Sequence, residues 1–158
     1  MTGSPYFHVG ILVENLEAAI DRFSKVLGLT FNDPLLAEFE WLEDPDPHEG
    51  FVRCTYSRQG PPFIELLEAN GDGLFSLAQG QGVHHMGFWD PDVDVQCGFL
   101  SGHGVAQGAR VANPDGTTFS LFTRPEDLFG LRLEVLHDAS REGTERWIAT
   151  GSFEDPAT

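Results

Sequence analysis

The chain has 158 residues, of which 41% are hydrophobic and 22% are charged, a composition typical of one globular domain with a sizeable core. Its 25 Asp and Glu residues outnumber 9 Lys and Arg residues, and the net charge of −16 leaves no clustered basic face for nucleic acid or an anionic membrane surface. There is no apolar run of membrane-spanning length, no signal-peptide pattern at the N-terminus and no cysteine framework, so we expect a cytoplasmic protein with reduced Cys54 and Cys97.

The first half of the chain is predicted to form a strand, then a helix, then three more strands. Residues 7–13 form a short apolar run rich in branched side chains, which is typical of a strand. Apolar residues then recur every three or four positions up to Leu27, which predicts an amphipathic helix with Asn15 as its N-cap and Gly28 after its C-terminus. The three later strands are expected over 36–43, 51–57 and 63–70, with an acidic turn over 44–50.

The same order of elements starts again after a turn at 69–73 and a short helical turn or linker at 74–82. The elements expected there are a strand over 83–89, a helix over 92–104, strands over 109–113 and 117–123 around an NPDG hairpin turn, and a last strand over 130–138. The final segment, 139–158, is polar except for Trp147 and Ile148, and we expect it to pack loosely or to fray.

The chain therefore reads as two copies of one β-α-β-β-β unit, spanning approximately 6–70 and 83–138. Aligning the copies places FHVGI, residues 7–11, over HHMGF, residues 84–88, and IELL, residues 64–67, over LEVL, residues 133–136. Each copy thus carries a histidine on its first strand and a glutamate on its last strand.

Two adjacent histidines occur in the second of these first strands. Neighbouring side chains on a regular strand point to opposite faces, so His84 and His85 are not expected to share a surface. His85 aligns with His8, and each lies two residues before a glycine, Gly87 and Gly10 respectively. We therefore expect His85 to point into the fold and His84 to face the other way, in a structural role near the surface.

The repeat points to a metal site. Glu65 aligns with Glu134, and both lie within apolar runs, where an ionised carboxylate is costly to bury unless it is paired or ligates a metal. Glu68 is the rival of Glu65, but it has the opposite strand parity and lies at the strand end. Two imidazoles and two carboxylates suit Zn, Ni, Co, Mn or Fe(II), and two facing modules would bring them to one point. The predicted ligands are His8, Glu65, His85 and Glu134.

At these motifs, and over roughly residues 6–138, the sequence resembles the vicinal oxygen chelate superfamily. The resemblance is carried by FHVGI, the helix ending in LG, FIELLE, VHHMGF and RPEDLFGLRLEVL. That superfamily includes glyoxalase I, methylmalonyl-CoA epimerase, extradiol dioxygenases, fosfomycin-resistance enzymes and bleomycin-binding proteins. The motifs are closest in style to methylmalonyl-CoA epimerase and glyoxalase I.

The resemblance implies an α+β fold in which two paired βαβββ modules form an open, U-shaped, eight-stranded mixed sheet around a metal cleft. It implies one domain over 1–138, with 139–158 as a C-terminal extension, and a homodimer. In the isomerase and lyase members, the ligands come from the first and last strands of the two modules. The corresponding positions of this sequence are the four residues already named.

The predicted function is that of a metal-dependent isomerase, epimerase or lyase. A proton is removed next to a carbonyl, the divalent metal stabilises the resulting enolate as a Lewis acid, and Glu134 acts as the principal base with Glu65 as its counterpart on the opposite face. The partner is a small carbonyl compound, and a hydrophobic one if aromatic residues line the cleft; the candidates are Phe39, Trp41, Phe51, Phe63 and Trp89. The alternatives are a non-catalytic ligand-binding or resistance protein and an Fe(II)-dependent extradiol-type dioxygenase.

Overall fold

The computed structural model describes residues 6–154 and contains the expected duplication. Residues 1–5 of the expected domain and 155–158 of the expected extension lie outside the described residues. The first module consists of β1 (His8–Val13), α1 (Leu16–Leu27), β2 (Leu35–Glu43), β3 (Pro47–Tyr56) and β4 (Phe63–Glu68). The second consists of β5 (Gly82–Asp90), α2 (Val93–Gly102), β6 (Gln107–Ala112), β7 (Thr118–Thr123) and β8 (Leu133–His137), followed by α3 (Arg141–Thr150).

The predicted ends of the first helix are confirmed. The side chain of Asn15 accepts a hydrogen bond from the Ala18 amide at 2.8 Å, as an N-cap does. Gly28 adopts a left-handed conformation with φ of 69°, and its amide donates to the Ser24 carbonyl at 3.0 Å. Within the described chain, none of the helices is both long and apolar enough to cross a membrane.

All eight strands belong to one mixed sheet, which confirms the α+β fold class. In both modules the first strand pairs in parallel with the last, β1 with β4 and β5 with β8, and the two modules join where β1 runs antiparallel to β5. The sheet is more closed than the expected open U, because β2 also pairs with β6 through Trp41–Ala112, Leu42–Val111 and Glu43–Arg110. This pairing covers two strand edges that an open sheet would leave exposed.

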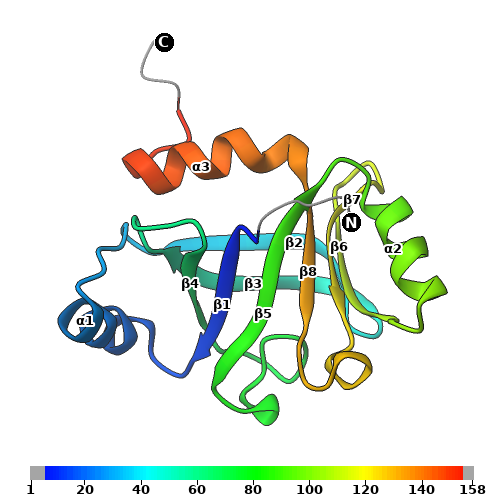
Figure 1. Cartoon of the computed structure of the whole chain (residues 1–158), viewed down its shortest axis with the longest axis horizontal. Helices are drawn as coiled ribbons and strands as arrows, with labels where there is room; N and C mark the ends of the chain where they lie inside the picture. Colours follow the sequence, from blue (N-terminus) through cyan, green and yellow to red (C-terminus); the bar gives the residue numbers. More distant parts are fainter. Residues whose placement is uncertain (1–5, 155–158) are drawn as a thin grey trace.

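The helices lie outside this curled sheet, so alternate strand residues point either to a helix or into the interior (Figure 1). On β4, Leu66 packs with Leu16 of α1, whereas the neighbouring Leu67 belongs to the interior core. On β8, Val135 packs with Val93 and Leu100 of α2. Glu65 and Glu134, next to these outward residues, therefore point to the inside.

A β-bulge changes the expected orientation of the two adjacent histidines. Gly10 of β1 is paired with His85, but the next residue, Ile11, is paired with Val83, so His84 is the extra residue of β5. Both His84 and His85 are buried, and their ring centroids are 5.1 Å apart. The expectation that they lie on opposite surfaces was wrong, because it assumed a regular strand.

Two other segments differ from the sequence prediction. β3 begins at Pro47, so the expected acidic turn over 44–50 is shorter and its second half is part of a strand. The segment after β8, expected to fray, forms α3, which lies across one end of the sheet (Figure 1). Trp147 and Ile148 are the reason, because both are buried against Tyr56, Leu136 and their neighbours.

Candidate metal centre

The structure brings the four sequence-predicted ligands together in its interior. Each comes from a different strand, and one ligand atom of each lies within 4.8 Å of all the others; this His–Glu cluster consists of His8, Glu65, His85 and Glu134. The Nε2 atoms of His8 and His85 are 2.7 Å apart. Each of these atoms lies 3.1 to 3.3 Å from an Oε2 atom of both glutamates.

The strand register explains why a glycine follows each histidine by two residues. Gly10 is paired with His85 on one side and Glu65 on the other, and Gly87 is paired with His8 and Glu134 in the same way. A Cβ atom on Gly10 would lie 2.2 Å from Cε1 of His85, and one on Gly87 would lie 2.1 Å from Cε1 of His8. Each glycine therefore leaves the space that the imidazole of the other module fills.

Gly87→Ala is expected to displace the His8 ring and to weaken metal binding at least about tenfold, with a loss of stability of about 1–3 kcal/mol. The control is Gly98→Ala, because a Cβ at this helical glycine meets no atom within 4 Å. That variant should bind metal normally and should gain up to about 1 kcal/mol. Titration calorimetry and thermal unfolding measure both effects, and normal metal affinity in Gly87→Ala would contradict the packing account.

The cluster is buried, and its charges control one another. Burial lowers the pKa of His8, but the carboxylates of Glu65 and Glu134 outweigh burial and raise this pKa to about 9. Burial also opposes the other shifts, yet the pKa of His85 is raised by Glu134, and the pKa values of both glutamates are lowered by the two imidazoles. Without a cation, protons on the imidazoles balance the two carboxylates.

The residues present fit a divalent metal ion. Two atoms that each lie about 2.1 Å from one ion are at most about 4.2 Å apart, and the contacts within the His–Glu cluster, 2.7 to 3.3 Å, lie below that limit. Oε2 of Glu65 is buried and makes no hydrogen bond of good geometry among the described residues, although the Nε2 atoms of His8 and His85 lie 3.3 and 3.1 Å away. A buried acceptor in that condition is costly unless a cation or proton meets it, so the donor set suits a first-row divalent metal.

His84 was missed by the sequence analysis, and it orients one of the candidate ligands. Its Nε2 atom donates to the Leu74 carbonyl at 2.9 Å, and burial lowers its pKa to about 3, so the ring is neutral and its Nδ1 is an acceptor. Nδ1 of His85 lies 2.8 Å from that acceptor and must donate to it. The Nε2 atom of a neutral His85 therefore presents its lone pair to the cluster, as a metal ligand requires. The two adjacent histidines were visible in the sequence, but only the β-bulge brings the side chain of His84 next to that of His85.

The raised pKa of His8 predicts that metal binding strengthens with pH. A cation must displace the His8 proton below about pH 9, and any proton on His85 as well, so the apparent affinity for Mn²⁺ should rise at least about tenfold per pH unit from pH 6.5 towards 9. The folded-state pKa of His8 lies above its unfolded value; its contribution to metal-free stability is therefore complete below pH 6.5 and is lost as pH rises through 9. Calorimetry at several pH values tests this, and a pH-independent affinity would contradict it.

A cavity of about 130 Å³ adjoins the cluster, and Glu65, His85 and Glu134 form part of its wall. Of the five aromatic residues proposed from the sequence to line it, only Phe39 does so. Trp41 and Phe51 are exposed, and Phe63 and Trp89 line a separate pocket near the start of β1. The aromatic lining comes instead from other residues, namely Tyr56, Phe75, Phe119, Phe122, Trp147 and Phe153.

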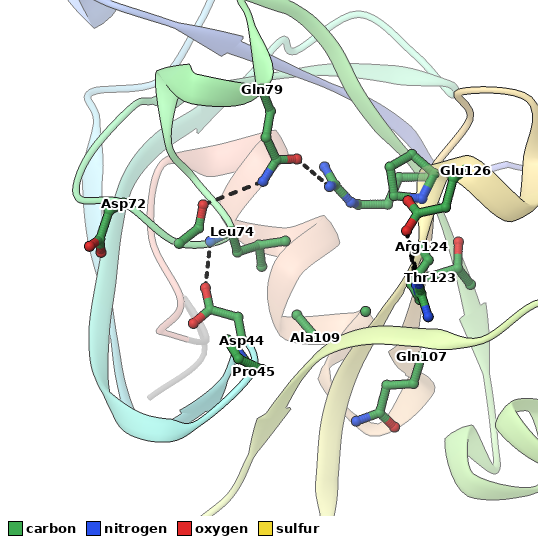
Figure 2. A pocket seen from close by; sticks show the side chains of 14 residues that line it. Asp44, Pro45, Asp72, Leu74, Gln79, Gln107, Ala109, Thr123, Arg124 and Glu126 are labelled. Carbon is green, nitrogen blue, oxygen red and sulfur yellow. Dashed lines mark hydrogen bonds and ion pairs between the residues drawn. The ribbon is translucent and has the colours of Figure 1, made fainter.

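A second, larger pocket of about 620 Å³ contains none of the cluster residues (Figure 2). It reaches Arg132 just before β8, whereas α3 follows the end of that strand. Several of its polar groups are paired with each other: Asp44 accepts from the Leu74 amide, and Arg124 forms an ion pair with Glu126 (Figure 2). The chemistry-bearing residues therefore assign the candidate site to the smaller cavity.

Fold and site together define an α+β protein of two fused βαβββ modules, with a donor cluster where the modules meet and a cleft above it. The model of the Glyoxalase/Bleomycin resistance protein/Dioxygenase superfamily matches residues 7–120. The chain belongs to this superfamily, which confirms the resemblance drawn from its motifs.

Solved structures of methylmalonyl-CoA epimerases share the fold. A variant of the Streptomyces coelicolor epimerase, in complex with 2-nitronate-propionyl-CoA, is 23% identical over 85% of this chain and 94% of that chain, with a TM-score of 0.62. The Mycobacterium tuberculosis epimerase is 20% identical over 84% of this chain and 86% of that chain, with a TM-score of 0.59. No curated protein matches the sequence.

Proposed function

We propose that the protein is a metal-dependent enzyme that moves a proton next to a carbonyl group, as an isomerase, an epimerase or a lyase. One observation carries this proposal: two buried imidazoles and two buried carboxylates converge at one point, and three of these four side chains form part of the wall of a cavity. Such a cluster costs free energy to bury, and a structural role alone would be served as well by apolar residues. The superfamily and the epimerase-like fold support the same conclusion.

The residues that would hold the divalent ion are the four members of the His–Glu cluster. When bound, the metal supplies Lewis acidity towards a carbonyl oxygen in the cavity. The hydrogen bond from His85 to His84 fixes the ring orientation, and mainly apolar side chains line the cavity beside the cluster. The identity of the metal is left open among Zn, Ni, Co, Mn and Fe, since nitrogen and oxygen donors suit all five.

The two glutamates are proposed to move the proton. The carboxylate of Glu134 takes a proton from the carbon next to the carbonyl, and the electron pair of that C–H bond moves into the carbonyl group to give an enolate. Glu65 must enter this step as the carboxylic acid; it then donates its proton to the opposite face of the same carbon, or to its neighbour, and becomes the carboxylate. Glu134 ends the step protonated, and exchange of its proton with Glu65 through solvent restores the starting state, so protons and net charge balance. The sheet order supports this division, because β4 and β8 lie on the two sides of the central β1–β5 pair.

A ligand-binding role without catalysis is the second candidate, and the mainly apolar lining of the cavity favours it. The two roles differ in their dependence on metal, because a sequestering protein would bind its ligand equally well after chelation. The third candidate, an Fe(II) dioxygenase of the two-His-one-carboxylate type, is disfavoured because the cluster holds a second carboxylate. Oxygen uptake with a catechol would reveal that activity.

Deuterium exchange tests the proposed reaction without knowledge of the natural substrate. The metal-loaded protein is incubated in D₂O with a panel of carbonyl compounds, and mass spectrometry detects deuterium next to the carbonyl. We expect incorporation that stops when a chelator is added and returns with metal. Ligand binding without any exchange, unaffected by chelation, would replace this proposal with the sequestering role.

A further inference from the structure

The size of the cavity limits what can reach the candidate metal centre. Its volume is about 130 Å³. An apolar cavity of about 150 Å³ in another protein holds a benzene molecule, so the space above the cluster suits a compact group of roughly six to eight carbon and oxygen atoms. A large, extended substrate would have to leave most of its atoms outside this space.

The lining of the cavity also excludes a second charge on the substrate. Outside the His–Glu cluster, its polar side chains are neutral ones, and they belong to Cys54, Tyr56, Ser120, Thr144 and Trp147. Within the described chain, no lysine or arginine lines it. Arginines that could hold an anion are engaged elsewhere: Arg53 pairs with Glu17 and Glu68, Arg110 with Glu43, and Arg124 with Glu126.

An anionic group in the cavity would therefore lie beside the carboxylates of Glu65 and Glu134, with the metal as its only counter-charge. Burying such an uncompensated charge is costly, whereas an apolar group gains free energy from the same environment. The cavity thus selects against anionic groups by charge and against bulky groups by size.

The C-terminal segment closes the cavity on the side of α3. Trp147 and Thr144 of this helix, together with Phe153 beyond it, form part of the wall. The Trp147 ring stacks on Phe153 at 5.7 Å and meets Tyr56 edge-on at 5.9 Å. The side-chain amide of Asn32 holds the helix in place by donating to the carbonyls of Trp147 and Ile148, at 2.7 and 3.1 Å.

From the size, charge and lining of the cavity, we infer that the substrate is a compact, uncharged, mainly apolar carbonyl compound that binds beneath α3, with Trp147 setting the upper limit of its size. That the substrate is a carbonyl compound rests on the proposed proton transfer, whereas its size and polarity are inferred from the cavity alone. This substrate class differs from the ligands bound in the solved epimerases of the same fold, which are CoA thioesters.

Two probes separate the inference from the proposed function: cyclohexanone, which is neutral and has a six-carbon ring, and propionyl-CoA, which is large and anionic. Saturation-transfer NMR on the Zn²⁺-loaded protein measures binding, and mass spectrometry measures deuterium exchange. We expect cyclohexanone to bind and to exchange at least tenfold more efficiently than the thioester. Binding without exchange would uphold the substrate class and overturn the proposed reaction. Exchange of the thioester with no binding of cyclohexanone would overturn the inference and leave the reaction standing.

Trp147→Ala tests the role of α3 as a size limit. The enlarged cavity should raise the efficiency of exchange on the bicyclic ketone 2-decalone, relative to cyclohexanone, at least tenfold. Trp41→Ala is the matched control, because Trp41 is 48% exposed and lies outside the cavity wall. Phe153→Ala, at a residue that is 55% exposed, gives a milder enlargement if Trp147→Ala fails to fold. An unchanged preference in both cavity variants would overturn the proposed limit.

Discussion

Glu134→Gln is expected to slow substrate-proton exchange by about 10²- to 10⁴-fold, the range that a positioned general acid or base contributes. The amide keeps an oxygen in place of the carboxylate but cannot accept the proton. Glu134 is buried in the wall of the cavity beside both imidazoles, so a carboxylate dissolved in the buffer cannot take its place as the base. The rate is to be measured at saturating metal, so that a weaker affinity does not contribute to the loss.

The matched control for this variant is Glu126→Gln, which removes an exposed carboxylate that is paired with Arg124 and lies outside the wall of the cavity beside the cluster. Its exchange rate should equal that of the unmodified protein. Glu65→Gln should lose protonation from the opposite face and should therefore block inversion of a stereocentre. Full exchange in Glu134→Gln, with metal bound, would remove Glu134 from its proposed role as base.

His85→Ala is expected to weaken divalent-metal affinity by more than the 10- to 100-fold that loss of an outer-shell partner costs. It removes a ligand atom and leaves two buried carboxylates facing a single imidazole. His8→Ala should have the same effect, because the two modules contribute equivalent histidines. His103→Ala is the control, since that histidine is exposed at the end of α2.

Titration calorimetry measures these affinities, and thermal unfolding shows whether each variant is folded. If His85→Ala does not fold, His85→Asn keeps a polar side chain of smaller size at the same position. Retention of full affinity in a folded variant of either cluster histidine would show that the ion binds elsewhere.

The duplication and the convergence of the four cluster residues could be predicted because both follow from short sequence patterns within each module. Strand parity places Glu65 and Glu134 on the inward side of their strands, and the same histidine-to-glycine spacing occurs in both modules. The glycines carry more information than the sequence analysis used. Gly10 and Gly87 each make room for the histidine of the other module, so the spacing already encodes how the modules face each other.

Features that depend on one module meeting another could not be predicted in this way. The bulge at His84 arises from the pairing of β5 with β1, and periodicity within one strand does not reveal it. The pairing of β2 with β6, which closes the sheet, involves residues far apart in sequence. For the same reason, exposed Trp41 and Phe51 could not be told from cavity-lining Phe39 by composition alone.

The C-terminal segment shows how tertiary contacts override local preference. Most residues of α3 are polar, and the helix is stabilised by a few contacts rather than by an apolar face. Burial of Trp147 and Ile148, with the hydrogen bonds from Asn32, is sufficient to order it. The two apolar residues in this polar segment, Trp147 and Ile148, indicated burial, and the prediction of fraying did not take that into account.

The most direct test of the account is the stoichiometry of divalent-metal binding to the metal-free protein by titration calorimetry at pH 7.5. We predict one ion per chain, with proton release on binding, because the imidazoles of the cluster hold protons that the cation displaces. The absence of binding, or binding that the double variant Glu65→Gln, Glu134→Gln leaves unchanged, would contradict a metal centre at the junction of the two modules.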